Sequence, residues 1–154
     1  MTSEEFEQRI VAMQDTLYRV SYSLLNRTCD REDAVQECIR RAWEKREQLR
    51  TDAYMQTWVI RILLRECYRT AGKGRREIPM DVLPQMDVSP IRDNTLHDAI
   101  LNLPEKLRIP IVLHYMEGYE LNEIGSMLRL PVGTVKTRLL GARKKLKAIL
   151  GEEV

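Results

Sequence analysis

The sequence has little of what builds a β-sheet or a membrane span. Stretches that alternate apolar and polar residues are nearly absent from its 154 residues, so strands are not expected. No apolar run approaches the roughly 18 residues that a membrane span requires. The opening MTSEEFEQ is acidic where a secretion signal would be basic. We therefore expect a cytoplasmic protein without membrane insertion.

Cysteine and histidine are also scarce, and neither is arranged for chemistry. Cys29, Cys38 and Cys67 lack CxxC spacing and lie within or beside apolar helical stripes, which predicts buried thiols rather than a disulfide or a metal site. His97 and His114 stand at no ligand spacing from a cysteine. An enzyme is a third alternative, based on carboxylates such as Glu32, Asp33 and Glu37, but these lack a supporting histidine, nucleophile or glycine-rich phosphate loop. The sequence thus predicts no catalysis, no metal and no cofactor.

What the sequence does contain is helical periodicity, with apolar residues at three- and four-residue steps almost throughout, which predicts an all-α protein. Thr2 and Glu5 form a plausible capping box for a first helix. Its expected inward stripe is Phe6, Ile10, Met13, Leu17, Val20 and Leu24. A second helix is expected from near Asp30, burying Val35, Cys38, Ile39 and Ala42. In a third, the inward positions are Trp58, Ile62 and Cys67, and Trp43 is also assigned to the core.

The periodic pattern stops between Gly72 and Asn94, where prolines stand at positions 79, 84 and 90. We predict two small helical domains, 1–72 and 95–154, joined by a flexible linker at 73–94. About 20 residues at ~3.3 Å each would span up to ~65 Å, so the two domains could occupy separate places on one large partner. In the second domain the expected helices are 96–101, 104–116, 121–128 and 132–150.

The last expected helix separates an apolar stripe from a cationic face. The stripe consists of Val135, Leu139, Ala142, Leu146, Ile149 and Leu150. No acid stands between Lys136 and Leu150, whereas a merely solvated face, the alternative, usually alternates its charges. The preceding ELNEIGSMLRLPVGTV has helix-turn-helix spacing, with Gly125 where two helices approach closely and Pro131 at a first-turn position.

This arrangement favours DNA binding, because the major groove admits one helix whose first residues meet base edges while flanking cations meet phosphates. The residues placed for base edges are Thr134, Lys136, Thr137, Arg138 and Leu140. Those placed for phosphates are Arg143, Lys144 and Lys147.

The stretch LPEKLRIPIVLHYMEGYELNEIGSMLRLPVGTVKTRLLGARKKLK resembles region 4 of bacterial RNA polymerase sigma factors of the extracytoplasmic-function group. EDAVQECIRRAW (32–43) and WVIRILLRECYR (58–69) are similar to region 2 of the same family. The resemblance implies a protein that binds core RNA polymerase, through the beta-prime clamp helices and the beta flap, and recognises the minus-35 and minus-10 promoter elements. It also implies an anti-sigma factor as a partner, and we expect a monomer when the chain is free.

Within region 2, the resemblance assigns one polar stripe to core polymerase: Asp33, Gln36, Glu37 and Arg40. It assigns the loop QLRTDAYMQT and the following helix to the minus-10 element, through Arg50, Tyr54, Arg61, Arg65 and Arg69. An aromatic ring beside cations suits unpaired bases. The alternatives are an ordinary amphipathic surface for the stripe and a packing role for Tyr54.

Three residues depart from the family pattern: Arg65 where Asn is frequent, Gly141 where Arg is frequent, and Arg129 at a turn position where Gly is usual. Gly141 either weakens its helix or permits close approach to DNA. A left-handed backbone at Arg129 would be strained. The leading hypothesis is a sigma factor. The runner-up, a stand-alone helix-turn-helix regulator, leaves EDAVQECIRRAW unexplained and calls for a dimerisation element that the sequence does not display.

Overall fold

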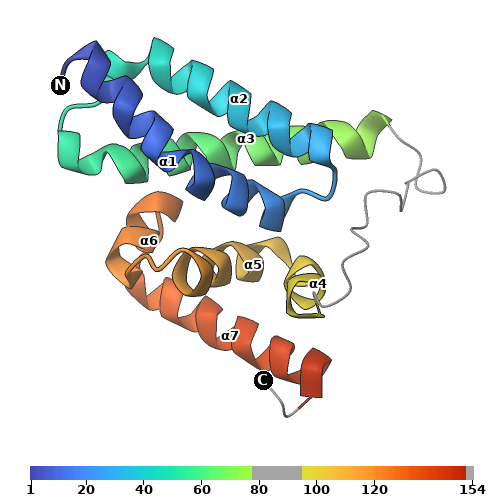
Figure 1. Ribbon diagram of the computed structural model, residues 1–154. Coiled ribbons are helices and arrows are strands. Elements are labelled where there is room, and N and C mark those ends of the chain that lie inside the picture. The colour runs from blue at the N-terminus through green and yellow to red at the C-terminus, as the bar shows by residue number, and fades with distance from the viewer. Residues whose placement is uncertain (78–94, 152–154) are drawn as a thin grey trace. The chain divides into compact units, whose positions relative to one another are not determined.

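The computed structural model describes residues 1–77 and 95–151, and every regular element within these ranges is helical (Figure 1). The chain divides into two compact units, one containing residues 1–77 and the other 95–151. The prediction of an all-α fold with two helical domains is confirmed. Helix α3 (Met55–Glu77) enters the range predicted as linker, and the remainder of that range, 78–94, lies outside the described residues.

The first unit is a bundle of three helices that contact one another pairwise: α1 (Ser3–Leu24), α2 (Thr28–Glu44) and α3. Two short 3-10 helices, η1 (Arg46–Gln48) and η2 (Asp52–Tyr54), connect α2 to α3. Figure 1 shows the three long helices running alongside one another. The connection therefore places the loop around Tyr54 directly at the start of α3.

Helix α1 begins with the predicted capping box. The Glu5 amide donates to Thr2 Oγ1 over 3.1 Å, and the Thr2 amide donates to Glu5 Oε1 over 3.0 Å. The Thr2 amide hydrogen bond also lowers the pKa of Glu5, because it stabilises the carboxylate. The inward stripe is buried from Phe6 to Val20 as predicted, but Leu24 is only half-buried. Leu25 is buried instead, because the chain becomes extended at this C-cap residue.

Helices α2 and α3 approach closely at Cys38, whose Sγ donates to the Val59 carbonyl over 3.6 Å. Burial raises the pKa of the Cys38 thiol. Cys67 is buried as well, but Cys29 is exposed, so the prediction of a buried thiol there was wrong. Cys29 lies in the first turn of α2, before the buried stripe of that helix begins at Ala34.

The other predicted inward positions of the first unit are mostly confirmed. Val35, Ala42 and Ile62 are buried, whereas Ile39 is half-buried because it faces the edge of the α2 stripe. The two tryptophans are half-buried and pack against Phe6, whose ring centroid lies 5.9 Å from Trp43 and 6.4 Å from Trp58. They therefore close the edge of the core rather than fill its centre.

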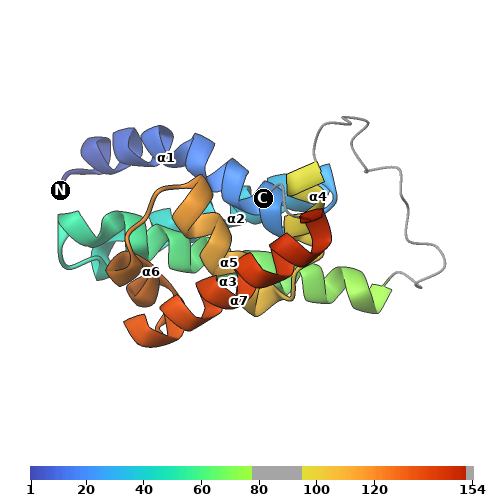
Figure 2. The same cartoon turned by 90° about the horizontal axis from the view of Figure 1, so that it is seen from below.

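The second unit consists of α4 (Thr95–Leu101), α5 (Glu105–Ile111), α6 (Leu121–Leu128) and α7 (Val132–Leu150), close to the predicted segments. The predicted helix 104–116 is an α-helix continued by a π-helical turn, η4 (Val112–Met116), in which the Glu117 amide donates to the Val112 carbonyl over 3.1 Å. Helix α7 contacts α4, α5 and α6. Figure 2 shows α5 along α7 and α4 near the carboxyl end of α7.

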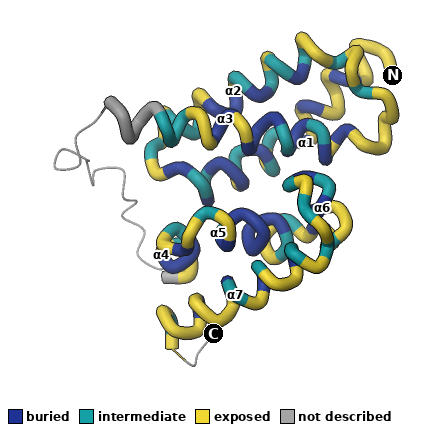
Figure 3. Tube along the Cα trace, turned by 180° about the vertical axis from the view of Figure 1, so that it is seen from behind, coloured by how far each residue is buried: buried dark blue, intermediate teal, exposed yellow. Residues whose placement is uncertain are grey.

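Helix α7 buries only a narrow stripe. Val135, Leu139, Ala142 and Leu146 are buried as predicted, while Ile149 is 50% exposed and Leu150 half-buried. The prediction was wrong for Ile149 and only partly met for Leu150, because at about 100° per residue these two positions lie on opposite edges of the buried stripe. Figure 3 shows α7 largely exposed along its length, in contrast to the mostly buried α5. A long outer face of α7 is thus open to a partner.

Candidate nucleic-acid interface

The turn between α6 and α7 lies directly against Gly125. A β-carbon at this position would stand 2.8 Å from the Leu130 carbonyl oxygen, closer than real Cβ atoms approach. The Leu130 amide donates to the Gly125 carbonyl over 2.9 Å, which fixes the turn on the end of α6. The predicted close approach at Gly125 is confirmed, and the two helices form the predicted helix-turn-helix.

Arg129 ends α6 in a left-handed conformation, with φ 59° and ψ 46°. Among residues 1–77 and 95–151, it alone combines a side chain with a positive φ. Such a backbone costs of order 1–3 kcal/mol in a residue other than glycine. The turn geometry expected to strain Arg129 is therefore present.

Helix α7 begins with an unobstructed first turn. The Pro131 carbonyl accepts from the amides of Thr134 and Val135 over 3.0 and 3.1 Å. A β-carbon at Gly133 would meet nothing within 4 Å. The hydroxyl of the exposed residue Thr137 donates to the Gly133 carbonyl over 3.0 Å.

The predicted DNA-contacting residues lie together on the outer side of α7. Thr134 and Arg138 are half-buried. The exposed members are Lys136, Thr137, Leu140, Arg143, Lys144 and Lys147. Lys145, which the prediction omitted, is exposed among them. A run of cations without a carboxylate on the same helix makes this face suitable for a polyanion.

Tyr115 is a candidate that the sequence did not reveal. The Arg143 guanidinium carbon lies 5.1 Å from the centroid of its ring, which is 55% exposed. His114 packs edge-on against Tyr115 and contacts the Tyr119 carbonyl oxygen through Nδ1 at 2.9 Å. Tyr115 lies on the π-helical turn. The sequence predicted an ordinary α-helix here, and that prediction did not indicate that position 115 would meet α7.

The surroundings of Gly141 distinguish between the two explanations for a glycine at this position, which are a weakened helix and close approach of DNA. A β-carbon at position 141 would lie 3.5 Å from Leu107 Cδ2, an ordinary van der Waals distance. The missing side chain therefore faces α5 and not the outer face of α7. This geometry favours the explanation that Gly141 weakens the helix over the explanation that it admits DNA.

In the first unit, the structure brings together some of the residues predicted for the minus-10 element. The Arg61 guanidinium carbon lies 5.4 Å from the ring centroid of Tyr54, which is 37% exposed. Arg50, Arg65 and Arg69 are exposed. Arg65 and Arg69 stand one turn apart on α3, which begins at the residue after Tyr54. The aromatic ring and these cations therefore belong to one continuous segment of the chain.

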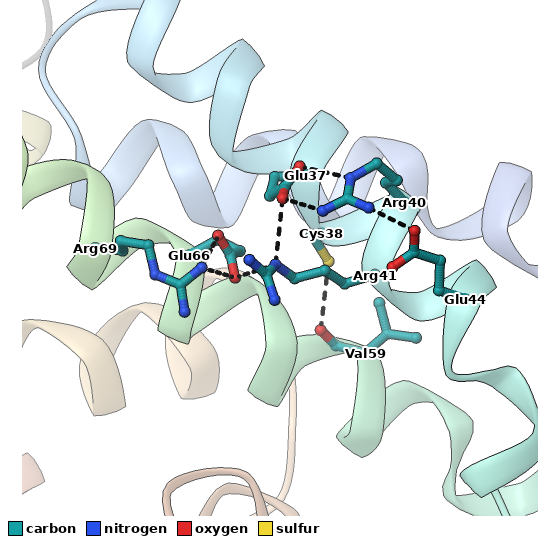
Figure 4. A network of polar contacts seen from close by, with 8 residues as sticks. All are labelled: Glu37, Cys38, Arg40, Arg41, Glu44, Val59, Glu66 and Arg69. Carbon is teal, nitrogen blue, oxygen red and sulfur yellow. Dashed lines mark hydrogen bonds and ion pairs between the residues drawn. The ribbon is translucent and has the colours of Figure 1, made fainter.

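The predicted polymerase-binding stripe lies on the outer side of α2, where Asp33, Gln36 and Arg40 are exposed and Glu37 is half-buried. Arg40 donates through Nε to Glu37 Oε2 over 2.9 Å and through Nη1 to Glu44 Oε2 over 2.6 Å (Figure 4). The hydrogen bonds from Arg40 hold the pKa of Glu37 below its usual value. Exposed pairs of this kind stabilise a fold very little, so a charged partner can replace them at small cost.

A buried carboxylate stands behind this stripe. The Glu66 side chain is 4% exposed, and among residues 1–72 and 96–151, whose burial the structure describes, Glu66 is the only charged residue that is buried. Arg41 Nε lies 3.0 Å from Glu66 Oε2 and 3.3 Å from Glu37 Oε1, without the alignment of a hydrogen bond to either. Arg69 Nη1 contacts both Glu66 oxygens at 3.2 Å (Figure 4). Periodicity along each helix did not indicate this pairing between α2 and α3.

No described helix combines the length and the apolarity needed to cross a membrane.

Comparisons with known proteins match both units. Residues 10–77 match the family model for Sigma-70 region 2, and residues 93–146 match that for Sigma-70, region 4. The chain is 29% identical to the ECF RNA polymerase sigma factor SigW of Bacillus subtilis, over 94% of this chain and 88% of that one. It is 30% identical to the RNA polymerase sigma factor SigV of the same organism, over 88% and 85%.

The fold is also that of a solved structure. The sigma factor RpoE of Bartonella quintana, crystallised with the anti-sigma factor NepR, superposes with a TM-score of 0.81 at 21% identity, covering 98% of this chain and 99% of that one.

Proposed function

The chain belongs to the extracytoplasmic-function group of RNA polymerase sigma factors, and on this premise we propose which of its surfaces bind polymerase and which bind DNA. Its function is to direct promoter-specific initiation of transcription by RNA polymerase. We propose that it has no catalytic step of its own and that the polymerase performs the chemistry. Since polymerase and promoter share one compartment, we place its action in the bacterial cytoplasm.

The outer face of α7 is the proposed minus-35 surface. The observation that carries this proposal is the run of exposed cations along α7, with no carboxylate on the same helix. Thr134, Lys136, Thr137, Arg138 and Leu140 stand on the first three turns, where a helix seated in the major groove meets base edges. Phosphate contacts are assigned to the exposed cations that follow, Arg143, Lys144 and Lys147. The open first turn at Gly133 supports close approach of the DNA backbone.

The first unit supplies the other two proposed surfaces. The outer stripe of α2, formed by Asp33, Gln36, Glu37 and Arg40, is assigned to the beta-prime clamp helices of the polymerase. The minus-10 surface is assigned to Arg50, Tyr54, Arg61, Arg65 and Arg69. Tyr54 is exposed beside the Arg61 guanidinium, a combination that can stack on an unpaired base and hold its phosphate.

The solved neighbour bound to NepR suggests that this chain too has an anti-sigma partner, which would hold it inactive. We also expect region 4 to contact the beta flap. We propose that residues 1–72 act as region 2, which binds core polymerase and the minus-10 element, and that residues 95–154 act as region 4, which binds the minus-35 element. Residues 73–94 are the proposed linker between them.

A pair of variants tests the surface assignment. Lys136→Glu should abolish promoter binding by the reconstituted holoenzyme but leave the affinity of the chain for core polymerase unchanged, because Lys136 is exposed on α7. The double variant Asp33→Ala, Glu37→Ala should weaken polymerase binding instead. Lys106→Glu, also exposed but on α5, is the matched charge control and should change neither.

If Lys136→Glu lost both promoter binding and polymerase binding, the role of α7 would be structural only. Unchanged polymerase affinity in the α2 double variant would remove that stripe from the polymerase site. A chain that binds specific DNA alone but never co-elutes with core polymerase would favour the stand-alone regulator.

A further inference from the structure

One guanidinium links the outer stripe of α2 to α3. Arg41 projects from α2, and its Nε lies between Glu66 Oε2 on α3, at 3.0 Å, and Glu37 Oε1 on α2, at 3.3 Å (Figure 4). Arg69, one turn after Glu66 on α3, reaches the same Glu66 carboxylate. The three side chains Arg41, Glu66 and Arg69 are called the Glu66 triad below.

The Glu66 carboxylate requires a counter-ion, because a buried unpaired charge is strongly unfavourable. Two arginines compete for this role. Arg41 is the nearer at 3.0 Å and the less exposed at 30%, whereas Arg69 lies 3.2 Å away and is 48% exposed. Arg69 also uses only Nη1 for the contact, so most of its guanidinium takes no part in it.

Glu37 does not draw Arg41 away from the triad. Arg40 already donates to both oxygens of Glu37, whereas the Arg41 contact to Glu37, at 3.3 Å, is longer than its contact to Glu66, at 3.0 Å. With one carboxylate and two guanidinium groups, the Glu66 triad carries a net positive charge. Arg69 is the more exposed of the two cations and is therefore the one that DNA can reach.

We propose that Arg41 is a positioning residue for promoter binding: as the counter-ion of Glu66, it leaves the Arg69 guanidinium available to the DNA backbone near the minus-10 element. The inference rests on the proposed function, which assigns Arg69 to that DNA. Without Arg41, Glu66 has Arg69 as its remaining ion-pair partner in the triad. Arg69 could then contact a phosphate only by leaving a buried carboxylate unpaired.

The test measures how much Arg69 contributes to DNA binding in three backgrounds. Reconstituted holoenzyme is titrated with a promoter fragment that is single-stranded over the minus-10 region, and the effect of Arg69→Ala on the dissociation constant is recorded. We expect about a tenfold loss in the wild-type background, as for one hydrogen bond to a charged group. The loss should shrink to less than about twofold in Arg41→Gln, and return to about tenfold in Arg41→Gln, Glu66→Gln.

Arg65→Ala is the matched control, because Arg65 is exposed one turn before Arg69 and stands outside the triad. It should weaken DNA binding by the same factor in all three backgrounds. Melting temperatures establish that each variant is folded, and if Arg41→Gln fails to fold, Arg41→Met, which also removes the charge but keeps an apolar stem, takes its place. Arg41→Lys keeps the counter-ion and should preserve the full effect of Arg69→Ala.

The outcomes separate the inference from the function on which it rests. If Arg69→Ala has no effect in the wild-type background, the assignment of Arg69 to DNA is wrong and the inference falls with it. If its effect is the same in Arg41→Gln as in wild type, only the role of Arg41 is overturned. If Arg41→Gln also abolishes the effect of Arg65→Ala, Arg41 acts through the fold of the unit, which contradicts a positioning role.

Discussion

The carbonyl oxygen of Leu130 lies 2.8 Å from the point that a β-carbon of Gly125 would occupy. The turn of the helix-turn-helix can close in this geometry because position 125 has no side chain. The contact is with backbone, which cannot rotate aside as the end of a flexible side chain could. The orientation of α7, and with it the proposed minus-35 surface, therefore depends on a glycine in α6.

Replacement of Gly125 by Ala should destabilise the second unit by about 1–3 kcal/mol, the usual cost of adding a methyl group to a filled space. It should also weaken binding to minus-35 duplex DNA, because α7 must shift. Urea unfolding followed by circular dichroism measures the first effect and fluorescence anisotropy the second. An unchanged unfolding midpoint would contradict the close approach.

Gly141→Ala is the matched change in the next helix and should have the opposite sign. The added methyl would meet Leu107 Cδ2 at 3.5 Å, and alanine is favoured over glycine inside a helix by up to about 1 kcal/mol. We expect a higher unfolding midpoint and DNA affinity within a factor of about two of wild type. A clear loss of DNA affinity in a stabilised variant would show that DNA approaches Gly141 after all.

The sequence predicted these helices well, since periodicity records which side of a helix is buried. It located α6 and α7 and their turn, and it placed Gly125 at the close approach. It failed at the edge of a stripe, as at Ile149, and at Cys29 in a first turn, because periodicity does not tell where the packing partner stops. The π-helical turn was also out of reach, because it is the last turn of its helix and no later residues display the shifted apolar stripe.

Arg129→Gly should stabilise the second unit by about 1 kcal/mol, because glycine adopts a left-handed backbone without the cost borne by other residues. Arg129→Ala is the control, since it removes the same charge but keeps the strain. Thermal unfolding of the three proteins should rank the glycine variant highest. Equal melting temperatures for the glycine and alanine variants would mean that the turn is not strained.

Acid should destabilise the first unit through Glu37. Hydrogen bonds from Arg40 lower its pKa in the folded chain, so the unfolded state binds a proton more readily. The stabilisation is therefore complete above the unfolded pKa of about 4.3 and is lost as pH falls through the lower folded value. Urea midpoints measured from pH 6 to pH 3 should fall less steeply for Glu37→Gln than for wild type. If the urea midpoints of the two proteins fell equally steeply with pH, Glu37 would not contribute to the acid destabilisation.

Binding to minus-35 duplex DNA should depend strongly on salt. If α7 neutralises about four to six phosphates, log affinity should fall against log salt with a slope of about −4 to −5. Lys144→Ala should reduce the magnitude of this slope by about 0.9, and Lys106→Ala on α5 should leave it unchanged. A slope that does not respond to Lys144 would remove this residue from the phosphate contacts.

The candidate site was predictable where it lies on one helix and not where it spans two. The cations of α7 follow from periodicity alone, because a single helical wheel places them on one face. Tyr115 meets Arg143, and Arg41 meets Glu66, only through packing of separate helices. In the sequence, Glu66 is one acid among several arginines, and nothing marks it as buried.

The most direct test of the central claim is transcription from a broad pool of genomic fragments by core RNA polymerase with and without this chain. The account predicts that adding the chain produces transcripts from a small set of fragments with shared sequences upstream of their start sites, and that Lys136→Glu abolishes them. If the chain neither associates with core polymerase nor directs initiation from any fragment, the account is contradicted.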